Sequence, residues 1–141
     1  MIKNAIVSAE TTIKVPFHDV DMLRIAWHGH YVKYFEVARC ELFETLGYGY
    51  LDMVASGYSW PVIDLNIRYA KPAQYDQDIV VTSAVVEYEN RLKIQYEIHD
   101  EKTGVRLTRG HTVQVAVDMK NNEMCFASPQ ILLDRLGVKD V

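Results

Sequence analysis

The chain has 141 residues, of which 15 are Lys or Arg and 19 are Asp or Glu, so its formal net charge is −4. That length suits one domain, and a domain of this size buries enough surface to fold without a disulfide or a metal. The mildly acidic balance argues against a nucleic-acid binder, which normally carries a basic surface. No apolar run approaches the length of a membrane span. We therefore expect a single soluble domain over residues 1–141.

Cysteine usage and the N-terminal residues indicate the compartment. Cys40 and Cys125 are the only two cysteines, too few for a disulfide framework and outside any paired metal-binding motif. Residues 1–7 lack the apolar core and the small-residue cleavage site of a signal peptide. These features predict a cytoplasmic protein.

The first half of the chain is predicted to contain a strand and two helices. Residues 11–17 alternate polar and apolar side chains, the pattern of a half-buried strand, and Pro16 places that strand near an edge or at its own end. A long helix of about 17 residues follows, because apolar side chains then recur at helical spacing. The residues on this face are Val32, Phe35, Leu42, Phe43 and Leu46, and Gly47 and Gly49 end the helix. A short second helix is expected at residues 50–55.

The second half is predicted to be mostly strand. Strands are expected at residues 62–69, 78–89, 92–98 and 105–117. Tight turns at residues 89–91 and 102–104 join the last three into an antiparallel meander. Ser128 and Pro129 are expected to begin a C-terminal helix, with the serine as N-cap and the proline at the first helical position.

This order of elements predicts an α+β fold. One long helix covers a curled five-stranded antiparallel sheet only if it lies across the concave face. Such a sheet leaves exposed edges, and pairing with a second copy of the chain is the usual way to cover them. We therefore expect a homo-oligomer.

The chemistry is concentrated between Asp19 and His30, at the start of the long helix. Asp19, Asp21, His28 and His30 bring two carboxylates and two imidazoles within twelve residues. The helix N-terminus exposes backbone N–H groups and partial positive charge, which can polarise a carbonyl group. A nearby carboxylate can act as nucleophile or general base, and an imidazole can orient or donate a proton. The segment thus predicts an acyl-transfer site that uses neither serine nor cysteine.

Two other interpretations use the same residues. Asp and His before a helix are also ordinary capping and loop residues. A metal-dependent hydrolase is the second alternative, because His18, Asp19, Asp21, His28 and His30 include nitrogen and oxygen ligands. Their spacing matches no established ligand pattern, so no metal site is predicted. Cys40 falls within the long helix, away from its N-terminus, and is not expected to be a nucleophile.

Three segments together resemble a known family signature. They are residues 17–21, Phe-His-Asp-Val-Asp, then His28 with the helical stretch 31–39, and residues 67–76, Ile-Arg-Tyr-Ala-Lys-Pro-Ala-Gln-Tyr-Asp. In this order they resemble the hotdog-fold acyl-CoA thioesterases of the 4-hydroxybenzoyl-CoA thioesterase type. The resemblance covers nearly the whole chain. It implies a hotdog fold, in which a curled sheet wraps one central helix, and hydrolysis of a thioester without a cofactor.

The resemblance also implies roles for individual residues. Asp21 corresponds to the catalytic carboxylate, acting as nucleophile or general base, and Asp19 to a structural residue that caps the turn. His28 matches a histidine of the branch that acts on aliphatic acyl-CoAs. The backbone N–H groups around Gly29, His30 and Tyr31 are then expected to polarise the thioester carbonyl.

The loop after Asp21 departs from the family pattern. Many relatives have glycine there, whereas this chain has Met22-Leu23-Arg24. These side chains can narrow the acyl pocket or rebuild the loop, and Arg24 can pair with an aspartate or point to solvent. A non-catalytic hotdog protein that binds an acyl group or an acyl carrier protein therefore remains the alternative function.

The family also implies where coenzyme A binds. Its site forms between two subunits of a dimer or a dimer of dimers, and the nucleotide lies on the partner's surface. Arg68, Lys71, Arg91 and Lys93 are candidate phosphate contacts because they are basic and flank strand ends. Acyl length, aromatic or aliphatic preference, and coenzyme A or carrier-protein substrate stay open.

Overall fold

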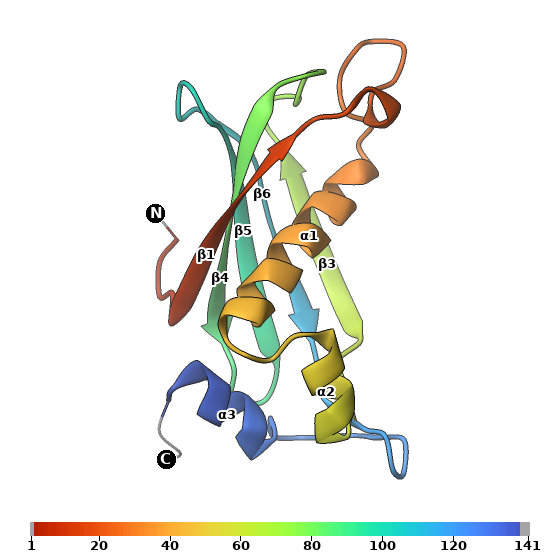
Figure 1. The fold of residues 1–141 in the computed structure, drawn as a ribbon, viewed down its shortest axis with the longest axis vertical. Coiled ribbons are helices and arrows are strands. Elements are labelled where there is room, and N and C mark those ends of the chain that lie inside the picture. Colours follow the sequence, from red (N-terminus) through yellow and green to blue (C-terminus); the bar gives the residue numbers. More distant parts are fainter. Residues whose placement is uncertain (1, 139–141) are drawn as a thin grey trace.

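A curled antiparallel sheet wrapped around one long helix forms the body of the protein (Figure 1). The computed structural model describes residues 2–138. Five strands form the main sheet in the order β1 (Val7–Lys14), β4 (Asp78–Glu87), β5 (Leu92–Asp100), β6 (Arg106–Gln114) and β3 (Val62–Tyr69). Each neighbouring pair is antiparallel. The α+β architecture and the meander expected from the sequence are therefore confirmed.

The long helix α1 (His30–Thr45) lies across the concave face of this sheet (Figure 1). Phe35 of α1 stacks on Tyr96 of β5 with ring centroids 4.3 Å apart, and both side chains are fully buried. Gly110 of β6 makes this approach possible, because a Cβ there would lie 2.8 Å from the Phe35 ring. The contact between helix and sheet thus depends on an aromatic pair and on one residue without a side chain.

The remaining elements are short. They are η1 (Phe17–Asp19), α2 (Tyr50–Ser56), β2 (Tyr58–Ser59), β7 (Val117–Asp118), β8 (Glu123–Met124) and α3 (Gln130–Leu136). β2, β7 and β8 form a separate three-stranded sheet.

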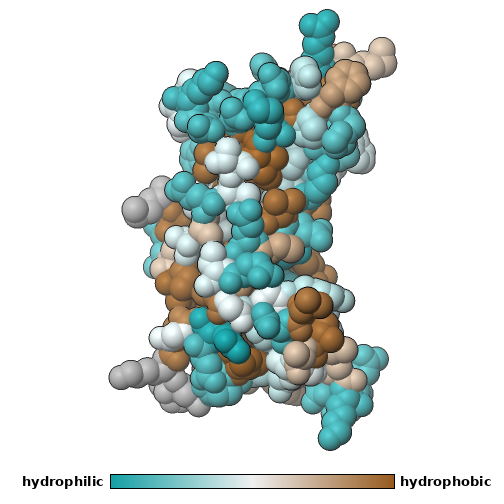
Figure 2. All heavy atoms as spheres, viewed as in Figure 1, coloured by the Kyte–Doolittle hydropathy of each residue, from teal (hydrophilic) through white to brown (hydrophobic). Residues whose placement is uncertain are grey.

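Figure 2 shows apolar side chains gathered over α2, where Tyr50, Leu51 and Val54 are exposed. In the part of the chain that the structure describes, no helix is long and apolar enough to cross a membrane.

Several boundaries differ from those expected. β1 begins at Val7 and ends at Lys14, because the chain turns at Pro16 into η1. The buried face of α1 centres on Tyr31, Tyr34 and Ala38, whereas Val32 is 39% exposed. The expected face left out the tyrosines, whose rings supply much of the buried surface.

Two C-terminal expectations were wrong. The long strand predicted to reach residue 117 ends at Gln114, and Val117 pairs instead with β2 and β8. Ser128 is not the N-cap of α3. Pro129 holds that position without a side-chain cap, and the Ser128 N–H donates to the Glu89 carbonyl.

β3 is an edge strand of the main sheet, with β6 as its one strand neighbour in residues 2–138. Val62, Ile63 and Leu65 on this strand are between 40% and 58% exposed. An edge strand with exposed apolar side chains is a surface on which another strand can pair.

Candidate active site

The loop between β1 and α1 is a small, well-anchored hairpin. Val20 bridges to Ala26, and Ile25 bridges to Gln74. The Ala26 N–H donates to the Ala73 carbonyl at 2.7 Å, which ties the loop to the segment before β4. The hairpin turns at Arg24, a non-glycine residue with a φ of 64°. The loop therefore has a fixed shape, and its side chains are held in position.

Asp19 fixes this loop to α1. Its side chain is fully buried and accepts hydrogen bonds from Lys33 Nζ at 2.6 Å and from the Tyr34 hydroxyl at 2.8 Å. Burial alone would raise the pKa of Asp19, but the two hydrogen bonds and the positive charge of Lys33 together hold the pKa below its usual value. The Asp19 side chain thus bonds to α1, whereas the resemblance implied that it caps the turn.

Asp21 has a different environment from Asp19. It is exposed, and its Oδ1 accepts the Leu23 N–H at 2.9 Å, whereas no described residue bonds to Oδ2. Asp21 lines a cavity of about 320 Å³ together with His28, Tyr31, Tyr69 and Lys71. The cavity also includes Ile25, Ala26, Ala70 and Pro72. The structure thus brings together in one pocket the carboxylate and imidazole selected from the sequence.

Two tyrosines hold the wall of this pocket. The Tyr69 hydroxyl donates to the His28 carbonyl at 2.6 Å, and the Tyr31 hydroxyl accepts the Ala73 N–H at 2.9 Å. The rings of Tyr31 and Tyr69 meet edge to face with centroids 4.9 Å apart. Burial raises the pKa of both hydroxyls, so they remain protonated at neutral pH. Tyr69 thus fixes the backbone at His28, and Tyr31 ties the start of α1 to the segment before β4.

The start of α1 offers fewer free N–H groups than expected. The His30 N–H donates to the Trp27 carbonyl at 2.9 Å, so it is not available to a substrate. The N–H groups of Gly29 and Tyr31 have no acceptor within residues 2–138. Gly29 also lies against the Trp27 side chain, and a Cβ there would displace the Trp27 ring. Two of the three selected N–H groups are therefore unpaired in the described structure, but of Gly29, His30 and Tyr31 only Tyr31 lines the Asp21 cavity.

Met22, Leu23 and Arg24, which stand where many relatives have glycine, do not block the Asp21 cavity. Met22 is fully exposed and Leu23 is 75% exposed, and neither lines the cavity. Arg24 is also exposed and makes no ion pair with Asp19 or Asp21 in the described structure. The loop is thus rebuilt without narrowing the space beside Asp21.

The basic residues expected to contact phosphate are separated. Lys71 lines the Asp21 pocket. Arg68 on β3 lies directly opposite Arg109 on β6, and both line a shallow hollow of about 200 Å³. Arg91 and Lys93 lie at the other end of the sheet, where Arg91 pairs with Glu87 at 3.0 Å. Within one chain, the structure joins only Lys71 to the candidate site.

The histidines near Asp19 do not assemble a metal centre. His18 Nε2 and His30 Nδ1 lie 3.7 Å and 3.9 Å from Asp19 Oδ1. Across the described part of the chain, no group of three or more His, Cys, Asp or Glu side chains is close enough to hold a metal ion.

Sequence reasoning missed Tyr69 as a site residue. It comes from the end of β3, 41 positions after the His28 carbonyl that it binds. Only the resemblance at residues 67–76 pointed toward this segment.

Comparison with known proteins identifies the family. Residues 15–134 match the Thioesterase-like superfamily. The chain belongs to this family. A DHNA-CoA thioesterase of Staphylococcus aureus is 32% identical, with 91% of this chain and 82% of that chain covered and a TM-score of 0.78.

Two further proteins extend the comparison. YneP of Bacillus subtilis, named provisionally as an acyl-CoA thioesterase, is 37% identical over 87 residues, and the match spans 62% of each chain. A 4-hydroxybenzoyl-CoA thioesterase mutant complexed with 4-hydroxybenzoyl-CoA has a TM-score of 0.80 at 15% identity, covering 92% of this chain and 98% of that chain. At that identity the likeness shows the fold alone. The family and its named members make this chain a thioester hydrolase with a hotdog fold.

Proposed function

We propose that the protein hydrolyses acyl-CoA thioesters and that Asp21 is the essential carboxylate. The observation that carries this proposal is the shared cavity of Asp21 and His28 at the N-terminus of α1. An exposed carboxylate with one unbonded oxygen can approach a carbonyl carbon or a water molecule. The free N–H groups of Gly29 and Tyr31 and the positive end of the α1 dipole supply the complementary charge.

The site supports two routes. The thioester carbonyl oxygen accepts hydrogen bonds from the Gly29 and Tyr31 N–H groups, which stabilise the negative charge that develops on it. In one route Asp21 attacks the carbonyl carbon, the C–S bond breaks, and water then cleaves the mixed anhydride. In the other, Asp21 removes a proton from a water molecule that attacks directly. Both consume one water and yield a carboxylic acid and a thiol, and the thiolate takes its proton from water or His28.

Homodimerisation through β3 is part of this proposal. β3 is an edge strand with exposed apolar residues, and Tyr69 at its end lines the Asp21 cavity. A partner strand paired along β3 therefore lies next to the site. This supports a site completed by a second subunit, in a dimer or a dimer of dimers.

The phosphates of coenzyme A are proposed to bind Lys71 and Arg68. Lys71 is in the cavity, and Arg68 faces Arg109 across the β3–β6 pair. Like charges directly opposite each other destabilise a sheet, although Glu97 of β5 lies opposite Arg109 on its other side. A bound phosphate relieves this repulsion. Arg91 remains a candidate only as a residue contributed from another subunit.

The acyl group is proposed to be aromatic, although the resemblance at His28 implied the branch that acts on aliphatic acyl-CoAs. The cavity wall contains the rings of His28, Tyr31 and Tyr69, and the Staphylococcus aureus relative is named for an aromatic acyl-CoA. Aromatic side chains meet another ring favourably edge to face or offset.

Free-thiol release from a panel of aromatic and aliphatic acyl-CoAs, and from the matching carrier-protein thioesters, tests the proposal. We expect the highest kcat/KM for an aromatic acyl-CoA. His28→Ala is expected to lower kcat more than it raises KM. No thiol release from any thioester in the panel would contradict the proposal and favour the acyl-binding alternative.

A further inference from the structure

Tyr69 connects the edge strand β3 to the turn that leads into α1. β3 ends at Tyr69, at the same end of the molecule at which α1 begins (Figure 1). The Tyr69 hydroxyl donates to the His28 carbonyl at 2.6 Å. Among the described residues, this is the only hydrogen bond that a β3 side chain makes to the segment between β1 and α1. A single hydroxyl thus ties the edge of the sheet to the segment that carries His28.

Tyr69 contacts the side chain of His28 as well as its backbone. The His28 imidazole meets the Tyr69 ring edge to face with centroids 6.4 Å apart, and the Trp27 ring lies 4.9 Å from the imidazole. Both distances are within the range over which aromatic rings attract each other. Within residues 2–138 the imidazole itself forms no hydrogen bond. Its position therefore depends on these two rings and on the backbone that Tyr69 holds.

The turn around His28 is fixed on both sides of the contact with Tyr69. The Trp27 N–H donates to the Asp19 carbonyl at 2.9 Å, and the His30 N–H donates to the Trp27 carbonyl at 2.9 Å. The His28 carbonyl lies between these two contacts, and Tyr69 supplies its hydrogen bond. Without the Tyr69 hydroxyl, the peptide group after His28 loses its link to β3 and is free to rotate.

The Tyr69 hydroxyl has no proton left for a substrate, although Tyr69 lines the Asp21 cavity. A phenol has one O–H group, and the hydrogen bond to the His28 carbonyl uses it. Burial raises the pKa of this hydroxyl, so it stays protonated and keeps the hydrogen bond at neutral pH. Tyr69 can therefore act through His28 but not as a proton donor to the reacting groups.

We infer that Tyr69 is a positioning residue for thioester hydrolysis, because its hydroxyl and ring keep the His28 imidazole at the cavity that it shares with Asp21. This role rests on the proposed function, in which His28 takes part in the reaction at that cavity. A displacement of about 1 Å in a reacting group is enough to lower kcat.

The kinetics of Tyr69→Phe test this role, because phenylalanine keeps the ring in the cavity wall and removes only the hydroxyl. We expect kcat for the best acyl-CoA substrate to fall about tenfold and KM to change by about twofold at most. Tyr69→4-aminophenylalanine keeps an N–H donor and should restore most of kcat. Tyr75→Phe is the matched control, because Tyr75 is 50% exposed against 48% for Tyr69 and lies outside the cavity. It should retain wild-type kinetics.

A double variant shows whether the effect passes through the imidazole. His28→Ala keeps the carbonyl but removes the imidazole, so adding Tyr69→Phe to it should lower kcat no further. An unchanged kcat in Tyr69→Phe would overturn the inference, and so would the same tenfold loss in the His28→Ala background. An equal loss in Tyr75→Phe, or no recovery with Tyr69→4-aminophenylalanine, would also overturn it.

Histidine-ring NMR signals separate this inference from the proposed function, because they do not require turnover. The signals of His28 are those that disappear in His28→Ala. We expect them to shift in Tyr69→Phe and to stay in place in Tyr75→Phe. An absence of thiol release by the wild type would refute the proposed function itself, whereas unmoved His28 signals in an active enzyme would refute only the role of Tyr69.

Discussion

Replacing Asp19 with alanine is expected to destabilise the protein mainly through Tyr34. The Tyr34 side chain is 1% exposed, and Asp19 Oδ2 accepts the hydrogen bond from its hydroxyl. Leaving this buried donor unpaired costs about 1–3 kcal/mol. The Lys33 side chain is 45% exposed, so its ammonium group can be hydrated and adds little. With about 2.1 cal/mol/K of unfolding entropy per residue, 1 kcal/mol shifts the Tm of this 141-residue chain by about 3 °C. Asp19→Ala should therefore lower Tm by about 3–10 °C.

Thermal melts at pH 7 and one fixed protein concentration measure this loss. Tyr34→Phe is the matched control, because it removes the hydroxyl and keeps the ring. In the double variant no buried hydroxyl is left unpaired, so its loss should be smaller than the sum of the two single losses. A Tm for Asp19→Ala within about 1 °C of the wild type, or strict additivity in the double variant, would refute this reasoning.

Three other predictions concern the loop and the edge strand. The pKa of Asp19 is lowered in the folded state, so its stabilisation is present above the unfolded pKa of about 3.9 and is lost as pH falls through the folded pKa. Thermal melts from pH 6 to pH 2.5 should therefore show that the Tm advantage of wild type over Asp19→Asn shrinks. A constant Tm advantage would contradict this. Gly29→Ala should displace the Trp27 ring and lower kcat at least tenfold, with a smaller loss of Tm than Asp19→Ala causes. Unchanged kinetics would show that the start of α1 does not depend on the contact between Gly29 and Trp27. Ile63→Lys on the edge of β3 should give a monomer in sedimentation equilibrium and lose thioesterase activity, whereas an unchanged, active oligomer would exclude β3 as the interface.

The order of elements was predictable because local patterns determine it. Alternation identified the main strands, and glycines marked the end of α1. The order of strands in the sheet was not predictable in the same way. β3 crosses to pair with β6 while β1 pairs with β4, and these contacts join residues far apart in the sequence.

The candidate site was predictable only in part. Asp21 and His28 lie seven residues apart, close to a recognisable helix start. The burial of Asp19 by Tyr34 and the contact of Tyr69 with His28 depend on tertiary packing, for which no local pattern exists. The hydrogen bond from the His30 N–H to the Trp27 carbonyl likewise follows from the conformation of the turn before α1.

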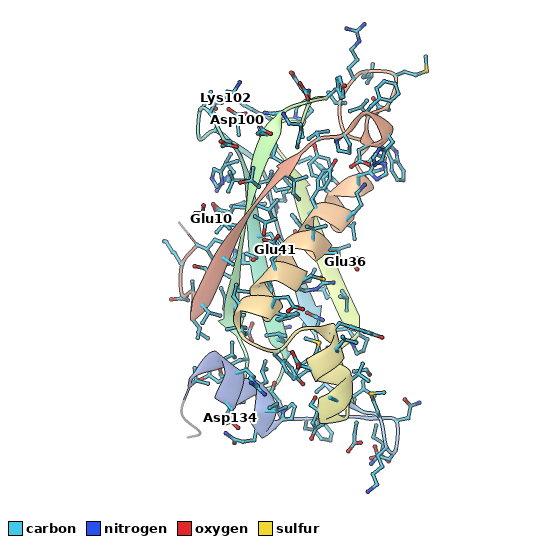
Figure 3. All side chains as sticks on the ribbon, in the orientation of Figure 1. Glu10, Glu36, Glu41, Asp100, Lys102 and Asp134 are labelled. Atoms are coloured by element: carbon cyan, nitrogen blue, oxygen red, sulfur yellow. The ribbon has the colours of Figure 1, made fainter. Side chains whose placement is uncertain are left out.

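The role of Asp21 is tested most directly by thiol release from the best acyl-CoA substrate with wild type, Asp21→Asn and Asp134→Asn. Asp134 is an exposed carboxylate on α3, far from the site (Figure 3), so its variant controls for the loss of one charge. The account predicts that Asp21→Asn lowers kcat by about a thousandfold or more while still folding and binding substrate, and that Asp134→Asn retains wild-type kinetics. A wild-type kcat for Asp21→Asn would contradict the proposed mechanism.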